Sequence, residues 1–383
     1  MQNQLPAVFE EFSDARKNGF LKAKKVKDNG GKIAGTFCTF VPVEVLDAAG
    51  IYCVSLCGMS EETIPDAERD LPKNLCPLIK SSYGFAVSDK CPYTYFSDIL
   101  VGETTCDGKK KMYEMLGEIK DMCVLQIPQG VDRSYALKLW RNEVRGFIEM
   151  IEQKFNVTIT EDALRSATDY RNRLRAAKCR LMELQKQTPP PMGGLALYKF
   201  IESTGFNFDW EGTITMVEDY IRSVEEAYAK GECAQTDSAK RILVTGCPTG
   251  GTVEKLTKAI EENGGVVVCF ENCGGIKPMR LQVDAEAENI VDAIADQYMD
   301  IGCAVMAPNP HRMEMLSGLL EEFQVDGVVD VALQACHPYK IEQRAIKTFC
   351  EGRNVPYLAM ETDYSQTDIG QINTRIAAFI EMI

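Results

Sequence analysis

Cysteine is the residue type in this chain with the widest capacity for chemistry. The 383 residues include 15 Cys but only 2 His. Thiolates without imidazole favour iron–sulfur clusters, zinc or copper(I) as bound groups. Because free Cys is also a common core residue, the placement of each cysteine must indicate which ones bind a metal.

Six cysteines come just after short apolar segments that are expected to be buried strands. They are Cys38, Cys57, Cys106, Cys247, Cys273 and Cys336. Open α/β sheets bind ligands outside the carboxyl ends of their strands, so these thiols are well placed to hold a metal. Core packing would instead put cysteines inside strands, where Cys53 and Cys269 are expected.

Two cysteines also precede expected helices. Cys76 comes before Pro77 in NLCPLIKSS, and Cys106 comes before GKKKMYEML. Helix N-termini lower the pKa of a thiol and favour bound anionic groups. One such cysteine is more often structural, whereas several at one sheet edge favour an iron–sulfur cluster, which we expect in a cleft between two domains.

Several common ligand-binding motifs are absent from the sequence. No G-x-G-x-x-G follows an expected strand, and the turn at 246–252 lacks the lysine of a P-loop, so it is either a tight turn or a cluster-holding one. There is no H-E-x-x-H, no C-x-x-C and no ferredoxin run. On an extended strand the C-x-x-x-C pairs 53/57 and 269/273 would stand roughly 13 Å apart. A metal site must therefore be gathered from dispersed loops.

The elements that would position these thiols alternate between strands and helices. Strands are expected at 33–37, 51–56, 98–102, 123–127, 242–246, 265–270, 303–306, 326–332 and 356–360. Their apolar residues show little alternation, which favours parallel strands buried on both faces. Helices are expected at 43–49, 109–119, 253–262, 285–298 and 343–351. The pattern predicts an α/β fold with two doubly wound, flavodoxin-like parallel-sheet domains.

The two halves of the chain form a weak internal repeat. KIAGTFCTFVPVEVLDAAG with IYCVSLCG resembles RILVTGCPTGGTVEKLTKAIEENGG with VVVCFENCGG. Between them, 134–240 carries charged segments with helical spacing of apolar residues. We expect an N-terminal α/β domain at 1–133, a helical segment at 134–240 and a C-terminal α/β domain at 241–383, with cluster-binding cysteines in both α/β domains.

Charge and hydropathy narrow the possible partners and location. The net charge of −14 disfavours nucleic acids and anionic membranes. The N-terminus lacks the pattern of a secretory signal, and no apolar run approaches the roughly 18 residues of a membrane span. We therefore expect a cytoplasmic protein with reduced thiols and with neither nucleic acid nor membrane as a partner.

Several segments resemble the 2-hydroxyacyl-CoA dehydratase/benzoyl-CoA reductase superfamily. They are FCTFVPVEVLDAAGI, NLCPLIKSSYGF, DILVGETTCDGKKKMYEML and LQACHPY. The resemblance spans most of the chain and is nearest to the double-cubane cluster proteins. It implies an oxygen-sensitive homodimer that reduces small molecules at an [8Fe-9S] cluster, made of two [4Fe-4S] cubanes joined by a sulfide. It also implies that ATP acts only through a separate ATP-hydrolysing [4Fe-4S] activator.

The resemblance also implies a ligand set. Each cubane gives one iron corner to the bridging sulfide, which leaves six corners for thiolates. The implied ligands are Cys38, Cys76, Cys106, Cys247, Cys273 and Cys336, with Cys57 and Cys303 in reserve. Two alternatives stay open. One is a lyase, a 2-hydroxyacyl-CoA dehydratase subunit with a single [4Fe-4S] cluster, and the other is a non-catalytic electron carrier.

Three further residues are candidate proton donors. Glu44 and Glu103 flank implied cluster ligands, and His337 follows Cys336. The alternative interpretations are a helix-start carboxylate for Glu44 and a hydrogen-bonded loop residue for His337. The lysines at 109–111 are expected on a solvated helix face, with a docking patch for the activator as the less favoured interpretation.

Overall fold

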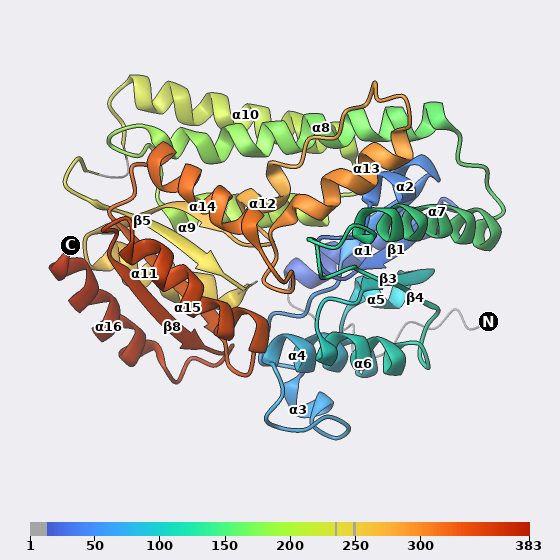
Figure 1. Ribbon diagram of the computed structural model, residues 1–383, viewed down its shortest axis with the longest axis horizontal. Coiled ribbons are helices and arrows are strands. Elements are labelled where there is room, and N and C mark those ends of the chain that lie inside the picture. The colour runs from blue at the N-terminus through green and yellow to red at the C-terminus, as the bar shows by residue number, and fades with distance from the viewer. Residues whose placement is uncertain (1–13, 234–235, 248–249) are drawn as a thin grey trace. The chain divides into compact units, whose positions relative to one another are not determined.

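The computed structural model describes residues 14–233, 236–247 and 250–383 (Figure 1). Its internal contacts divide the chain into two units. Unit 1 holds residues up to Arg171 together with Gly205–Phe208 and Val283–Met299, and unit 2 holds Asn172–Thr204, Asp209–Gln282 and Asp300–Ile383. The chain therefore leaves unit 2 and returns to unit 1 twice, at Gly205–Phe208 and at Val283–Met299.

Unit 1 is built on a four-stranded parallel sheet. Its strands are β1 (Lys32–Thr36), β2 (Ile51–Ser55), β3 (Ile99–Glu103) and β4 (Met122–Leu125), in the order β2-β1-β3-β4. This order matches the start of the flavodoxin-like arrangement. The two central strands are almost wholly buried, as expected from their unbroken apolar runs, so the four strands predicted in the first half are confirmed.

Helices surround this sheet in unit 1. They are α1 (Asp14–Asp28), α2 (Val43–Ala48), α3 (Ile64–Ala67), α4 (Pro77–Val87), α5 (Pro92–Phe96), α6 (Asp107–Leu116), α7 (Ala136–Phe155), the first part of α8 (Glu161–Glu183) and α13 (Ile290–Tyr298). Arg141 of α7 forms an ion pair with Asp296 of α13. The helix predicted at 285–298 begins only at Ile290, because the Asn289 side chain caps it by accepting from the Asp292 N–H at 3.0 Å.

Unit 2 repeats the same sheet topology. Its strands are β5 (Lys240–Gly246), β6 (Gly265–Glu271), β7 (Gly327–Leu333) and β8 (Tyr357–Thr362), in the order β6-β5-β7-β8 and all parallel. The sheet lies in a large apolar core that includes Val267, Phe270 and Val329. The predicted α/β class with two doubly wound parallel sheets is thereby confirmed.

The strand predicted at 303–306 is wrong. These residues form a turn, in which the Met306 N–H donates to the Cys303 carbonyl at 3.0 Å. Cys303 and Met306 are buried, so the short run is apolar because it packs in the interior. It does not pair in a sheet, and periodicity alone cannot separate these two cases.

The remaining helices belong mainly to unit 2. They are η2 (Leu184–Lys186), α9 (Gly194–Ser203), η3 (Thr204–Phe206), α10 (Trp210–Ala229), α11 (Gly251–Glu262), α12 (Ile276–Met279), η4 (Met299–Ile301), α14 (Pro310–Glu322), α15 (His337–Glu351) and α16 (Ile369–Met382). The long helices α8 and α10 run side by side, joined by ion pairs such as Arg180 with Glu218 (Figure 1). The segment predicted to be helical holds α7 to α10, and the domain limits at 133 and 240 stay a prediction. None of the described helices is long and apolar enough to cross a membrane.

A buried carboxyl group stands in the middle of β7. Asp330 is 1% exposed and accepts a hydrogen bond from the Tyr357 hydroxyl at 2.8 Å. Burial raises the pKa of Asp330 to about 6, although the Arg312 guanidinium acts in the opposite direction. Because its ordinary value is 3.8, the folded state binds the Asp330 proton more tightly than the unfolded state does.

We predict that this carboxyl group makes stability depend on pH between about 4 and 6. The stabilisation is fully present below the unfolded-state pKa and is lost as pH rises through the folded-state pKa, with a total on the order of 3 kcal/mol. Urea unfolding of the apoprotein at several pH values should show this fall in the wild type and a flatter profile in Asp330→Asn. The same pH profile in both proteins would contradict the prediction.

Candidate metal centre

In unit 1, two cysteines lie where the strand order reverses direction. Cys38 follows β1 and Cys106 follows β3, and these two strands are neighbours at the centre of the sheet. In doubly wound sheets the loops diverge at this switch point, so ligands bind there. The backbone of Cys38 has a φ of +68°, which is uncommon for a residue other than glycine and is characteristic of functional sites.

Cys76 joins these two thiols from α4. Cys76 and Cys106 are the N-cap residues of α4 and α6, as predicted, and Pro77 occupies the first turn of α4. Gly108 in α6 lets the helices approach closely, because a Cβ there would collide with the Ile79 side chain of α4. Burial raises the pKa of Cys106, and the neighbouring Cys76 and Cys38 thiols add to that effect. The three predicted ligands of this unit therefore lie near enough to one another for their thiols to interact electrostatically.

The site in unit 1 contains a fourth thiol and a buried cation. Cys57 follows β2, and its Sγ lies 4.0 Å from the Nζ of Lys109. Lys109 is 6% exposed, so the prediction of a solvated helix face is wrong for this lysine. It holds for Lys110 and Lys111, whose side chains are 43% and 74% exposed. Burial opposes the charge of Lys109, but the Cys38 and Cys57 thiolates outweigh it and hold its pKa well above the usual range.

Several buried oxygen atoms around these thiols are unsatisfied. Both carboxylate oxygens of Glu103 lack a hydrogen-bond partner of good geometry among the described residues. The hydroxyl groups of Thr105 and Tyr113 lack one as well. Burial raises the pKa of Glu103 well above its usual range, and the Cys38 thiolate adds to this, while the nearby amides of Phe40 and Val41 act in the opposite direction. An unsatisfied buried polar atom costs about 1–3 kcal/mol, and native structures contain few of them. Their concentration here favours a bound group at this place.

In unit 2 the equivalent switch point also carries two cysteines. Cys247 follows β5 and Cys336 follows β7, which are the central neighbouring strands. The Leu333 N–H donates to the Cys247 Sγ at 3.0 Å. The backbone is again strained, because Ala335 has a φ of +56° and Gly246 one of +126°. Only glycine fits at 246, where a Cβ would overlap the Val331 carbonyl. Pro248 and Thr249 of this turn lie outside the described residues.

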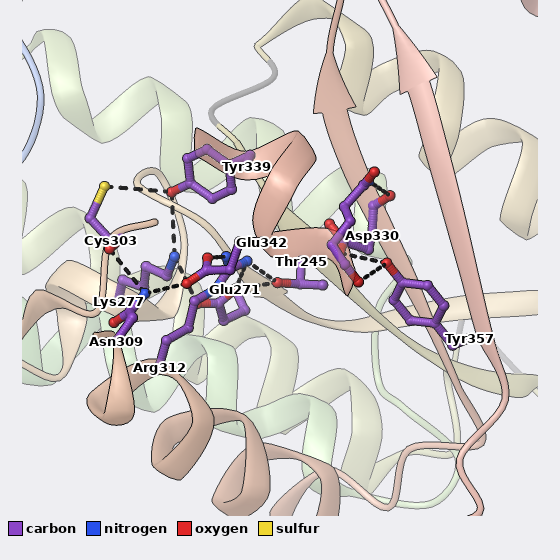
Figure 2. Close-up of polar contacts among 11 residues, drawn as sticks. Thr245, Glu271, Lys277, Cys303, Asn309, Arg312, Asp330, Tyr339, Glu342 and Tyr357 are labelled. Carbon is purple, nitrogen blue, oxygen red and sulfur yellow. Dashed lines mark hydrogen bonds and ion pairs between the residues drawn. The ribbon is translucent and has the colours of Figure 1, made fainter. Parts of the chain in front are cut away.

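Two further cysteines of unit 2 lie near one buried tyrosine. The Tyr339 hydroxyl is 3.9 Å from the Cys303 Sγ, and Cys273 is close enough to affect the pKa of Tyr339. Figure 2 shows this hydroxyl directed toward Cys303 and toward the Nζ of Lys277, which lies at 3.5 Å. Burial raises the pKa of Tyr339 well above its usual range, so the phenol stays protonated and can donate a hydrogen bond to a sulfur atom.

A buried ionic network supports this tyrosine. The Lys277 Nζ lies 2.8 Å from a Glu271 carboxylate oxygen, and Arg312 contacts the other oxygen at 3.2 Å (Figure 2). Arg312 also forms an ion pair with Glu342, so the opposite charges balance. Burial works against ionised Glu271, but the Arg312 and Lys277 cations hold its pKa below the usual range. Pairing of this kind is what makes buried charges tolerable.

The remaining predicted residues have different surroundings. Glu44 is fully buried in the first turn of α2 and accepts a hydrogen bond from the Tyr298 hydroxyl at 2.8 Å. His337 is the exposed first residue of α15. Tyr298 lies on α13, so the contact of Glu44 joins distant parts of unit 1 and could not be read from the local sequence.

Iron–sulfur ligation is compatible with these arrangements. No group of three or more His, Cys, Asp or Glu in the described part of the chain is arranged to hold a single metal ion. In an iron–sulfur cluster, however, each thiolate binds a different iron atom, so the thiols need not meet at one point. The candidate metal ligands are thiols. The Leu333 N–H donates a hydrogen bond to the Cys247 sulfur, and hydrogen bonds of this kind tune the reduction potential of such clusters.

Sequence reasoning missed the residues that surround the thiols. Lys109 belongs to a run of three lysines, and Lys277, Arg312 and Tyr339 lie far apart in the sequence. A helical wheel of α6 would have indicated that Lys109 is buried, because it lies on the same face as the apolar residues of this helix. That buried face holds Lys109, Met112, Tyr113 and Leu116.

Comparison with known proteins identifies the family of this chain. Residues 38–383 match the family described as 2-hydroxyglutaryl-CoA dehydratase, D-component. The chain is 50% identical over 380 residues to the putative dehydratase subunit YjiM of Escherichia coli, covering 99% of this chain and 98% of that protein. It is 22% identical to the beta subunit of (R)-2-hydroxyglutaryl-CoA dehydratase of Acidaminococcus fermentans, with 99% of this chain and all of that protein aligned.

A component of a reductase is similar as well. One of the subunits of benzoyl-CoA reductase from Thauera aromatica is 24% identical, with 99% of this chain and 96% of that protein aligned. The superfamily suggested by the sequence motifs is thus confirmed. The chain belongs to the 2-hydroxyglutaryl-CoA dehydratase D-component family, which shares a superfamily with benzoyl-CoA reductase subunits.

Proposed function

We propose that the protein is an iron–sulfur oxidoreductase that reduces small molecules at an [8Fe-9S] double-cubane cluster. A separate ATP-hydrolysing [4Fe-4S] activator would supply the electrons, and the working form would be a homodimer. The main support is that cysteines follow both central strands of both sheets, next to strained backbone. One such site would suit a single cubane, whereas two matched sites suit a cluster with two halves.

Six thiolates would bind this cluster, three from each unit. The proposed ligands are Cys38, Cys76 and Cys106 in unit 1 and Cys247, Cys273 and Cys336 in unit 2. When bound, the cluster supplies low-potential electrons to the substrate. The chain itself holds the sulfur ligands, excludes water from the buried residues around them and offers Glu44, Glu103 and His337 as candidate proton donors.

A second candidate function is a 2-hydroxyacyl-CoA dehydratase subunit with a single [4Fe-4S] cluster. The names of relatives favour it, since several are beta subunits of dehydratases. In that case Cys38, Cys76, Cys106 and Cys336 would suffice as ligands, and a different subunit would be the partner.

Replacing Cys247 or Cys273 by Ala should distinguish these two functions. For a double cubane we expect about eight irons per chain in the wild type and a fall to about half or less in either variant, because a metal–thiolate bond is lost. The matched control is Cys350→Ala, which removes a buried thiol from the unit 2 core and should cost stability without changing the iron count.

Anaerobic purification followed by iron and acid-labile sulfide analysis measures these counts. About four irons per chain in the wild type and in both variants would contradict the double cluster and leave the dehydratase subunit as the better account.

We also predict that reduction of the cluster depends on a partner protein. The sequence contains no nucleotide-binding motif of the types considered, so ATP should support reduction of the bound cluster only when the activator is added. Anaerobic absorption spectroscopy with ATP, and with a non-hydrolysable analogue as control, measures this. Reduction by ATP in the absence of activator would contradict the prediction.

A further inference from the structure

We propose that Lys109 is a positioning residue whose buried ammonium group is the counter-charge of the unit 1 sulfur site and stabilises the reduced state of the group bound there. This inference rests on the proposed function, because it requires an iron–sulfur group on the unit 1 thiols. It holds for a double or a single cubane, since Cys38, Cys76 and Cys106 are ligands in both cases.

The three neighbouring lysines of α6 differ sharply in their surroundings. Lys110 and Lys111 are exposed, and each forms an ion pair on its own helix, with Asp107 and Glu114 respectively. Lys109 is 6% exposed, and no carboxylate among the described residues lies within ion-pair distance of it. The buried lysine of the three is therefore the one without a carboxylate at ion-pair distance, although the Glu103 carboxyl acts on it from further away.

A buried ammonium group without a counter-charge is costly, by several kcal/mol after relaxation. In unit 2 the Glu271 carboxylate offsets this cost for Lys277, because one of its oxygens lies 2.8 Å from the Lys277 Nζ. In unit 1 the contact that the Lys109 ammonium group makes is with sulfur, because the Cys57 Sγ lies 4.0 Å from its Nζ. The negative charge of the thiolates, and of any cluster that they hold, is therefore the counter-charge of the Lys109 ammonium group.

Helix geometry fixes Lys109 at this place. Lys109 lies three residues after the N-cap Cys106, whose side chain makes no cap hydrogen bond of good geometry. The Lys109 N–H is nevertheless near enough to this thiol to act against the rise in its pKa. One residue thus directs both a backbone donor and an ammonium group to the sulfur site. Lys109 shares the buried face of α6 with Met112 and Leu116.

This placement predicts an electrostatic effect on electron uptake. Reduction adds one electron from the activator to the bound group and makes its charge more negative by one. The Lys109 ammonium attracts the reduced state more strongly than the oxidised state, so removing that positive charge should make reduction harder.

The test compares Lys109→Met with the exposed control Lys110→Met in anaerobically prepared holoprotein. The ratio of reduced to oxidised cluster is measured by spectroscopic redox titration at a fixed applied potential. We expect the ratio to fall several-fold in Lys109→Met and to match the wild type in Lys110→Met. Equal ratios in both variants would overturn the inference.

A second measurement separates the electrostatic role from a merely structural one. Because Lys109→Met removes a costly buried charge, the apoprotein variant should melt no lower than the wild-type apoprotein, while its gain in melting temperature on cluster binding should be smaller. A lower melting temperature of the apoprotein with an unchanged redox ratio would show that Lys109 serves packing only.

Loss of the cluster in the variant is also informative. If Lys109→Met binds no iron, Lys109→Arg restores the charge and should restore iron binding, whereas failure of both variants would overturn the inference. Failure of the proposed function is seen separately, because a wild-type protein without iron would exclude an iron–sulfur function before any variant is compared.

Discussion

The divergence of loops at the centre of a doubly wound sheet is the constraint on which the rest of this structure depends. Where the strand order reverses, the loops after neighbouring strands turn to opposite faces and leave the carboxyl ends open. Both sheets place cysteines there, after β1 and β3 and after β5 and β7. The strands are buried and apolar, so the sheet cores fix the strand ends that these cysteines follow. Cys38 comes just after one of them and has a φ of +68°.

Charge compensation differs between the two units. In unit 2, Lys277 and Arg312 are neutralised by Glu271 and Glu342, so the protein supplies both signs. In unit 1, Lys109 lies beside a thiol, and the buried carboxyl of Glu103 lacks hydrogen bonds of good geometry within the described residues. A buried site with unmatched polar groups is costly in the empty protein, which is why unit 1 gives the stronger indication of a bound anionic group.

Local signals in the sequence were sufficient for the strands and for the helix starts at Cys76 and Cys106, because buried strands and N-caps depend on neighbouring residues. They failed at 303–306, where an apolar run packs in a turn, and at Lys109, where a lysine occupies the buried face of α6. Contacts such as Tyr298 with Glu44 and Tyr339 with Cys303 join residues that are distant in sequence. Such contacts follow from tertiary packing, which no local pattern records.

The central claim is that the thiols at the two switch points hold an iron–sulfur centre. Anomalous X-ray diffraction at the iron edge, on crystals of anaerobically purified protein, tests it most directly because it locates iron atoms without reference to activity. The account predicts iron beside Cys38, Cys76 and Cys106 and beside Cys247, Cys273 and Cys336. Crystals without iron at these cysteines, or with iron bound elsewhere in the chain, would contradict it.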